Sequence, residues 1–384
     1  MYSFCAEANC TDGIEPEGVL AQGTNGNFYG VTNGGGSNCP SIISAGCGTV
    51  FEVAPTGALR TLYNFCGQPN CTDGAFPAAG LVEATSGYFY GTTSEGGSTF
   101  CAAVANGCGT IFKISPTGTL ATLYNFCSQS GCTDGVYPTA PLIQATNGDL
   151  YGTTGSGATN TTCGNTSGSQ PLFDGCGTVF KITPSGTLTT LYTFCTELMS
   201  NTCPDGAYPS GLVQGIDGNF YGTTYYGGEP CVIPEVTGGL PGCGTIFRIT
   251  PNGVLTTLHS FCAESGCPDG LTPAEGVIEH TNGEFYGTNG FNGVSNGTVY
   301  SLSEGLSSFV ELRPPHGDVG KAIKILGTGL TGATSVSFNG TAAAFTVVSS
   351  SEITTTVPVG ATTGRVEVVT PGGTLSSNVA FLVQ

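Results

Sequence analysis

The sequence predicts an all-β protein: a five-bladed β-propeller with four antiparallel strands per repeat, followed by an immunoglobulin-like β-sandwich. Three observations carry this prediction. Two short motifs recur together in five tandem copies. The segments between them read as short strands and tight turns, without a convincing helical period. The composition also changes near residue 313, so we expect the propeller in residues 1–312 and the sandwich in residues 313–384.

The repeat is defined by two motifs. The first ends in Tyr-Gly, and its tyrosines are 61, 61, 70 and 65 residues apart. The second is Gly-Thr followed by an apolar pair. In the second copy we expect strands A to D at 80–84, 88–93, 109–115 and 119–126. A unit this small cannot bury both faces alone, which favours stacked propeller blades over a linear solenoid or separate small domains.

The connections between strands divide the expected propeller into two faces. The A–B and C–D turns are short in every copy, whereas the B–C loops carry all the variation in length. In an up-and-down blade the B–C and D–A loops lie on the same face. Because loops on a rigid scaffold commonly carry function, we expect any recognition to use this B–C/D–A face.

The 18 cysteines form nine local couples, five in D–A loops and four in B–C loops. We predict nine disulfides within loops, with cross-pairing of the two families inside one blade as the alternative. Disulfides persist in oxidising compartments, so the protein should be exported. The couples are Cys5/Cys10, Cys66/Cys71, Cys127/Cys132, Cys195/Cys203 and Cys262/Cys267 in D–A loops, and Cys39/Cys47, Cys101/Cys108, Cys163/Cys176 and Cys231/Cys243 in B–C loops.

Charge and hydropathy exclude two classes of partner. The formal net charge is −18, and residues 1–312 hold 23 acids against four bases. Such a surface repels phosphate backbones, so nucleic-acid binding is not expected, while cations or basic partners could be attracted. No segment approaches the length of an apolar membrane span. No leader sequence is visible at Met1, although the chain should be exported. We therefore expect the sequence to be that of a processed form or a fragment.

Few residues suggest chemistry. With every cysteine paired no thiol nucleophile remains, and the three histidines (His259, His280 and His316) form no plausible triad or metal cluster. We expect no cofactor and no confident metal site. Tyr225 and Tyr226, in a B–C loop, are candidate binding residues. A ring of five aspartates, each followed by glycine, is a candidate calcium site, although Asp-Gly also simply makes turns. These are Asp12, Asp73, Asp134, Asp205 and Asp269.

Two resemblances follow from these patterns. The segments 151–154, 177–181 and 183–186 resemble the bacterial GloVer tandem repeat, whose carriers are exported or surface-anchored. The segments 325–330, 336–340, 356–358 and 369–373 resemble the IPT/TIG immunoglobulin-like domain, a spacer or interaction module of surface proteins. Neither resemblance implies a chemical activity.

These observations favour a non-enzymatic structural or adhesive protein of the cell surface or extracellular space, with self-association into a homopolymer as a candidate assembly. The alternative is a module that binds a glycan or a cation through the B–C/D–A face. A propeller lyase or glycosidase is least favoured, because the repeats lack symmetry-breaking acids or histidines of the kind active sites need.

The chain ends add one expectation. Tyr2-Ser3-Phe4-Cys5 matches the end of a D strand, and we expect the fifth unit to have its own D strand at 306–312. Six D-type segments would then compete for five blades. The segment at residues 2–4 would either pair at the fifth blade and close the ring, or be donated to a neighbouring molecule.

Overall fold

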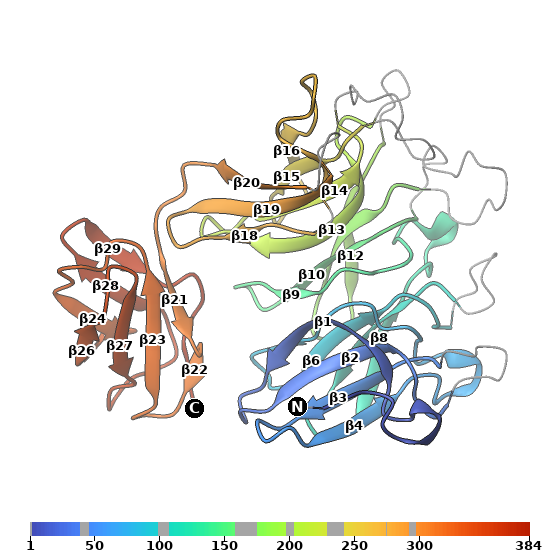
Figure 1. Ribbon diagram of the computed structural model, residues 1–384, viewed down its shortest axis with the longest axis horizontal. Helices are drawn as coiled ribbons and strands as arrows, with labels where there is room; N and C mark the ends of the chain where they lie inside the picture. Colours follow the sequence, from blue (N-terminus) through green and yellow to red (C-terminus); the bar gives the residue numbers. More distant parts are fainter. Residues whose placement is uncertain are drawn as a thin grey trace. The chain divides into compact units, whose positions relative to one another are not determined.

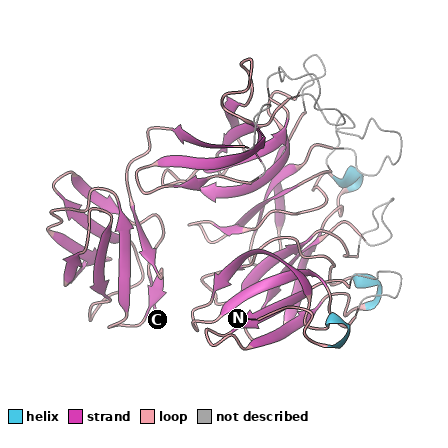
Figure 2. Cartoon of the chain, viewed as in Figure 1, coloured by secondary structure: helices cyan, strands magenta, loops and turns pink. Residues whose placement is uncertain are grey.

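The structure is a computed structural model that describes residues 2–38, 46–98, 107–157, 175–196, 203–228, 242–273, 275–291 and 297–384. It is all-β, and its helical segments are short 3₁₀ turns: η1 (Ala8–Cys10), η2 (Pro69–Cys71) and η3 (Ser130–Cys132) (Figure 2). The chain divides into two compact units. The first holds residues 1–213, 220–277 and 288–299, and the second holds residues 214–219, 278–287 and 300–384.

Four antiparallel sheets repeat one order along the chain, with each strand paired to the next (Figure 1). We call them sheets 1 to 4. Within each, the strands A to D are joined as the sequence predicts. Sheet 1 is β1 (Ile14–Gln22), β2 (Phe28–Gly34), β3 (Thr49–Val53) and β4 (Leu59–Asn64); sheet 2 is β5 (Val82–Glu83), β6 (Phe89–Thr93), β7 (Thr110–Ile114) and β8 (Leu120–Asn125). Sheet 3 is β9 (Ile143–Gln144), β10 (Leu150–Thr154), β11 (Thr178–Ile182) and β12 (Leu188–Thr193); sheet 4 is β13 (Ala207–Gln214), β14 (Phe220–Tyr226), β15 (Thr245–Ile249) and β16 (Leu255–Ser260).

The Gly-Thr motif recurs because its threonine joins strands B and C. The hydroxyl of Thr110 lies 2.8 Å from that of Thr93, and both side chains are buried. Buried polar groups need hydrogen-bond partners, so the pair satisfies itself. The same pair occurs in the other three sheets, as Thr32/Thr49, Thr154/Thr178 and Thr224/Thr245.

Aromatic rings join neighbouring sheets of the first unit. The ring of Tyr29 stacks on Phe89 of the next repeat with centroids 4.0 Å apart. In the first three repeats the phenylalanine that follows the D strand packs edge-on against a C-strand phenylalanine of the next repeat, as Phe65 does on Phe112 at 5.2 Å. Each sheet therefore buries its face against the next, as propeller-like repeats do.

The fifth repeat differs from the prediction. Strand A is split into β17 (Leu271–Pro273) and β18 (Ile278–Glu279), both paired with β19 (Glu284–Phe291), and β20 (Thr298–Ser303) pairs with the other edge of β19. The prediction of a D strand at 306–312 is wrong. Instead, β21 (Val310–Arg313) pairs with β23 (Ala322–Gly327) of the C-terminal part. The boundary expected at 312/313 thus falls inside a strand.

The C-terminal part of the second unit is built on two four-stranded sheets and one short pair. Its core is aliphatic and phenylalanine-rich, with Ile325, Val336 and Phe381 fully buried. The first sheet is β21, β23, β27 (Glu352–Thr356) and β26 (Phe345–Val347); the second is β25 (Thr341–Ala343), β24 (Ser335–Phe338), β28 (Val366–Thr370) and β29 (Gly373–Ser376); the pair is β22 (His316–Gly317) and β30 (Leu382–Val383).

Among the described residues, no helix is both long and apolar enough to cross a membrane.

Candidate functional site

The A segments of neighbouring repeats approach each other closely in the first unit. A Cβ added to Gly80 would meet the backbone oxygen of Val19 at 2.5 Å, and one added to Gly276 would meet the oxygen of Gly211 at 2.7 Å. Both distances are shorter than real contacts allow, so only glycine fits at these two positions. These contacts bring together the A segments of the first and second repeats, and those of the fourth and fifth.

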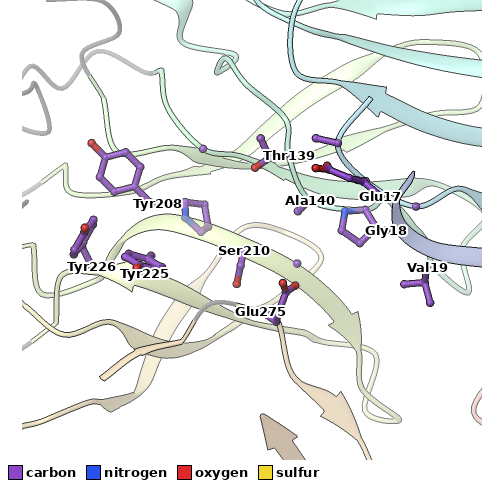
Figure 3. A pocket seen from close by; sticks show the side chains of 17 residues that line it. Glu17, Gly18, Val19, Thr139, Ala140, Tyr208, Ser210, Tyr225, Tyr226 and Glu275 are labelled. Carbon is purple, nitrogen blue, oxygen red and sulfur yellow. The ribbon is translucent and has the colours of Figure 1, made fainter. Parts of the chain in front are cut away.

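A cavity of about 650 Å³ opens where these A segments converge. Its volume lies within the range of small-molecule sites. Residues from all five A segments line it, together with the ends of two B strands, at Gly155 in the third repeat and Tyr225 and Tyr226 in the fourth. Starts of A strands and ends of B strands lie toward the B–C/D–A face. Figure 3 shows three tyrosines grouped on one side, with the carboxylates of Glu17 and Glu275 pointing into the space between the strands.

The cavity lining departs from the repeat. Each A segment contains a proline soon after its Asp-Gly turn. The position after this proline is Glu17 in the first repeat, and it is alanine, threonine, serine and alanine in the second to fifth repeats, in that order. The position after that holds Glu275 in the fifth repeat and glycine or alanine elsewhere. Symmetric positions therefore carry acids in two repeats only.

The argument from sequence against an active site, that symmetry-breaking acids are missing, is accordingly wrong. Glu17 and Glu275 were missed because the repeats were compared at their Tyr-Gly and Gly-Thr motifs. Aligning the five segments on the proline after each Asp-Gly turn would have revealed both acids.

Three tyrosines form one wall of the cavity. The rings of Tyr208 and Tyr226 meet edge-on at 5.7 Å, and those of Tyr225 and Tyr226 at 4.7 Å. Burial, and secondarily the neighbouring tyrosine, raises the pKa of Tyr208 and of Tyr226. These phenols therefore stay neutral and can donate hydrogen bonds. Tyr225 and Tyr226, predicted in a loop, lie instead at the end of β14.

Tyr208 owes its position to an unusual backbone. It has φ +57°, and the equivalent residue before proline in every other repeat also has φ between +52° and +56°. A left-handed conformation is uncommon for residues other than glycine. Its recurrence sets the side chain at the same place in each A segment, and in the fourth repeat that side chain is the tyrosine that lines the cavity.

The five aspartates of the predicted ring do not come together. Four of them accept hydrogen bonds from the end of the preceding D strand, and Asp12 accepts them from Tyr2, Ala6 and Glu7, forming what we call a turn latch. Asp134 accepts from the Tyr124 hydroxyl at 2.8 Å and from the Ser128 amide at 2.9 Å. Burial, and then the hydrogen bond to Asp134, raises the pKa of Tyr124 to about 12. Asp12, Asp73, Asp205 and Asp269 make equivalent latches in the other repeats.

The histidines also lie apart. The Nε2 atom of His259 contacts Asp269 in the last turn latch. His280 contacts Asn282 in an exposed turn, and His316 lies in β22. No two of them share a site within the described ranges.

The structure pairs the D–A cysteines locally, as Cys5–Cys10, Cys66–Cys71, Cys127–Cys132, Cys195–Cys203 and Cys262–Cys267. Cys47, Cys108, Cys176 and Cys243 are also disulfide-bonded. The other B–C cysteines, Cys39, Cys101, Cys163 and Cys231, lie outside the described residues, so these four pairings stay predictions.

Two groups of sulfur atoms come within metal-binding distance of each other. They are Cys47 with Cys66 and Cys71, and Cys176 with Cys195 and Cys203. All six are disulfide-bonded, so they offer no thiolates to an ion. Within the described part of the chain, no carboxylates or histidines gather in such a group.

Comparisons with known proteins identify the repeat. The family model described as the Gloeobacter/Verrucomicrobia repeat matches residues 1–230 and 174–347. This confirms the resemblance drawn from the repeats. No curated protein matches the chain.

Several solved structures are similar at low identity. A fungal alcohol oxidase of the AA5 family in complex with copper is 12% identical, with a TM-score of 0.42, covering 95% of this chain and 75% of its own. An endo-arabinase from Bacteroides thetaiotaomicron is 12% identical, with a TM-score of 0.34, covering 77% and 95%. An α-L-arabinofuranosidase from Clostridium thermocellum is 12% identical, with a TM-score of 0.35, covering 75% and 88%. Similarity this distant says nothing about ligands or catalysis.

Proposed function

The chain belongs to the Gloeobacter/Verrucomicrobia repeat family, and from this premise we propose that it is an exported, non-enzymatic binding protein that holds a saccharide in the cavity of a five-bladed propeller. Residues that follow the propeller form an immunoglobulin-like domain of the IPT/TIG type. The five disulfides support export, because such bonds persist in oxidising compartments.

The two finer assignments of fold rest on topology. Five sheets each contain A, B and C strands in the same antiparallel order, which supports five blades. The two C-terminal sheets, with orders β21-β23-β27-β26 and β25-β24-β28-β29, share one buried core and support a sandwich.

One observation carries the proposed function: the symmetry of the repeats breaks at the cavity. Structural contacts recur with nearly the same residues: four of the five turn latches pair tyrosine with aspartate, and four sheets share the threonine pair. Around the cavity, by contrast, the first and fifth repeats supply acids, the third and fourth supply hydroxyls (Thr139 and Ser210), and the fourth supplies aromatic rings. Sites on repeat scaffolds are built by such local departures.

The lining suits a saccharide. Tyrosine faces pack against the apolar faces of sugar rings, and the phenol hydroxyls remain able to hydrogen-bond. Carboxylates and hydroxyls accept and donate hydrogen bonds with sugar hydroxyls. No disulfide-free thiol, cofactor or metal cluster is needed for such binding.

The test is a glycan array with the full chain, followed by calorimetry on the saccharides that bind. Tyr225→Ala should weaken binding about ten-fold, because it removes one aromatic face of the wall. Tyr88→Ala is the matched control, since Tyr88 is exposed outside the cavity with Lys113 over its ring. The proposal fails if no saccharide binds, or if Tyr225→Ala and Tyr88→Ala bind equally. Product analysis of the same mixtures tests the absence of catalysis.

A second candidate is the structural or adhesive role in a homopolymer, and β20 favours it. Among the described residues β20 is paired on one side only, with β19. Val299 on this strand is 77% exposed, whereas its counterpart Val179 is fully buried. Exposed edge strands template pairing with another chain. Sedimentation of the wild type and of Val299→Lys tests this candidate: a concentration-independent monomer in both rejects it.

A further inference from the structure

The two acids of the cavity differ from several other acids near strand ends, whose carboxylates have partners within the protein. The turn-latch aspartates and Glu52, for example, are occupied by hydrogen bonds or an ion pair with Arg60. Glu17 and Glu275 have no ion-pair or hydrogen-bond partner for their carboxylates within the described residues. Their negative charge is therefore uncompensated by the protein.

The protein supplies no cation nearby. Lysine, arginine and histidine are absent from the cavity lining that the structure describes. The first 312 residues contain only four bases, of which Arg60 pairs with Glu52 and Lys113 lies over Tyr88. The overall charge of −18 adds to the negative potential of the cavity. Glu17 and Glu275 are exposed to solvent, so the cavity favours a ligand that carries positive charge.

The lining also indicates what carries that charge. A bare metal ion needs several oxygen ligands at close range, and no such group of carboxylate oxygens occurs in the described residues. An organic cation instead places its charge near carboxylates and its carbon framework on aromatic rings. The tyrosine wall and the two acids line the same cavity and lie on opposite sides of it in the view of Figure 3.

We propose that the cavity recognises an amino sugar through its protonated free amine, with Glu17 and Glu275 facing the ammonium group and the tyrosine wall facing the sugar ring. This inference rests on the proposed saccharide-binding function. Acetylation of the amine removes both the charge and two donors, so N-acetylated sugars should bind less well.

The experiment compares oligomers of β-1,4-linked glucosamine with N-acetylated oligomers of equal length, using calorimetry on the full chain at about pH 6, where the sugar amine is protonated and the glutamates are ionised. The free-amine oligomer should bind about ten-fold more tightly, the difference expected for one charge-assisted contact. In the Glu17→Gln/Glu275→Gln double variant this preference should disappear, because the amides can still hydrogen-bond to sugar hydroxyls but no longer carry the charge that faces the amine.

The control variant is Glu264→Gln/Asp318→Asn, which removes the same charge at exposed positions outside the cavity lining. It should keep the preference. If the preference survives in the cavity double variant, or is absent from the wild type, the amine inference is overturned while saccharide binding can stand. If neither oligomer nor any neutral glycan binds, the proposed function itself fails.

Discussion

The Nε2 atom of His259 lies 2.8 Å from the Oδ2 atom of Asp269, where the other four repeats place a tyrosine hydroxyl on the equivalent aspartate. The turn latch therefore keeps its geometry although its donor changes. The Asp-Gly dipeptide therefore recurs because its aspartate forms the latch and closes the turn. It does not recur because the five aspartates share a ligand.

The first prediction concerns the strength of the latch. Asp134 is fully buried, so Asp134→Ala leaves the Tyr124 hydroxyl and the Ser128 amide without their acceptor. We expect a loss of about 2–4 kcal/mol in the free energy of unfolding, measured by urea denaturation. Asp269 is 29% exposed, so water can replace it, and Asp269→Ala should cost only about 1 kcal/mol. Equal losses in the two variants would contradict this account.

The second prediction is a pH dependence at Glu279. Its counterpart Glu83 accepts hydrogen bonds from the amide and hydroxyl of Thr24. Among the described residues, Glu279 accepts only the Ile216 amide, and its buried Oε2 has no partner. Burial, and then the charge of Asp217, raises the pKa of Glu279 to about 7 from an ordinary value of 4.5. The third repeat has Gln144 at this position, which accepts the Thr85 amide without a charge.

Because the folded state prefers the protonated acid, Glu279 contributes its stability fully below pH 4.5 and loses it as the pH rises through 7. Glu279→Gln should therefore raise the free energy of unfolding at pH 8 by about 1 kcal/mol. This is less than the full pKa shift would give, because the site is half-exposed and solvent screens the charge. At pH 4.5 the free energy of unfolding should change little. Thermal unfolding at the two pH values measures this. Glu83→Gln is the matched control and should bring no gain at pH 8.

The regular parts of the fold could be predicted from the sequence, because their signals are local. Thr110–Ile114 lies inside the strand expected at 109–115, since alternation and the flanking glycines define it. The D strand expected at 306–312 was wrong because its apolar alternation suits either neighbour. Long-range pairing of Val310–Arg313 with Ala322–Gly327 decides between them, and no local pattern reveals that.

The cavity was harder to predict for a related reason. Glu17 and Glu275 occupy adjacent, not identical, positions of the A segment, and the A strand itself varies from nine residues in β1 to two residues in β5 and β9. Their convergence appears only when the repeats are assembled. Tyr225 and Tyr226, by contrast, could be chosen as candidates because an aromatic pair after Tyr-Gly-Thr-Thr occurs in one repeat only.

The third prediction is the disulfide map. Non-reducing peptide mapping should find nine disulfides, namely the five seen in the D–A turns and four more joining the B–C couples such as Cys39/Cys47. A peptide linking two repeats would refute it. Replacing Cys127 and Cys132 by serine should cost about 2 kcal/mol, because a loop with a sequence separation of 5 restricts the unfolded chain only modestly.

The last prediction concerns the N-terminal segment. Residues 2–4 form no strand pairing within the described part of the chain, so the closing strand expected there does not appear. Instead the ring of Phe4 packs on Phe51 of sheet 1 at 5.0 Å, in the manner of Phe65 on Phe112. The segment thus takes the place of a preceding repeat's D-strand end, and the Tyr2 hydroxyl completes the first turn latch on Asp12.

Phe4→Ala should therefore lower the free energy of unfolding by about 1–2 kcal/mol, because Phe4 is only partly buried. The corresponding loss for a fully buried phenylalanine such as Phe65 is typically about 3–5 kcal/mol. Urea denaturation of Phe4→Ala and Phe65→Ala gives both values, and sedimentation of the Phe4→Ala chain shows its assembly state. A destabilised variant with unchanged assembly supports packing within the molecule. Lost assembly with unchanged stability would instead mean that residues 2–4 act between molecules, and no change in either property would remove both roles.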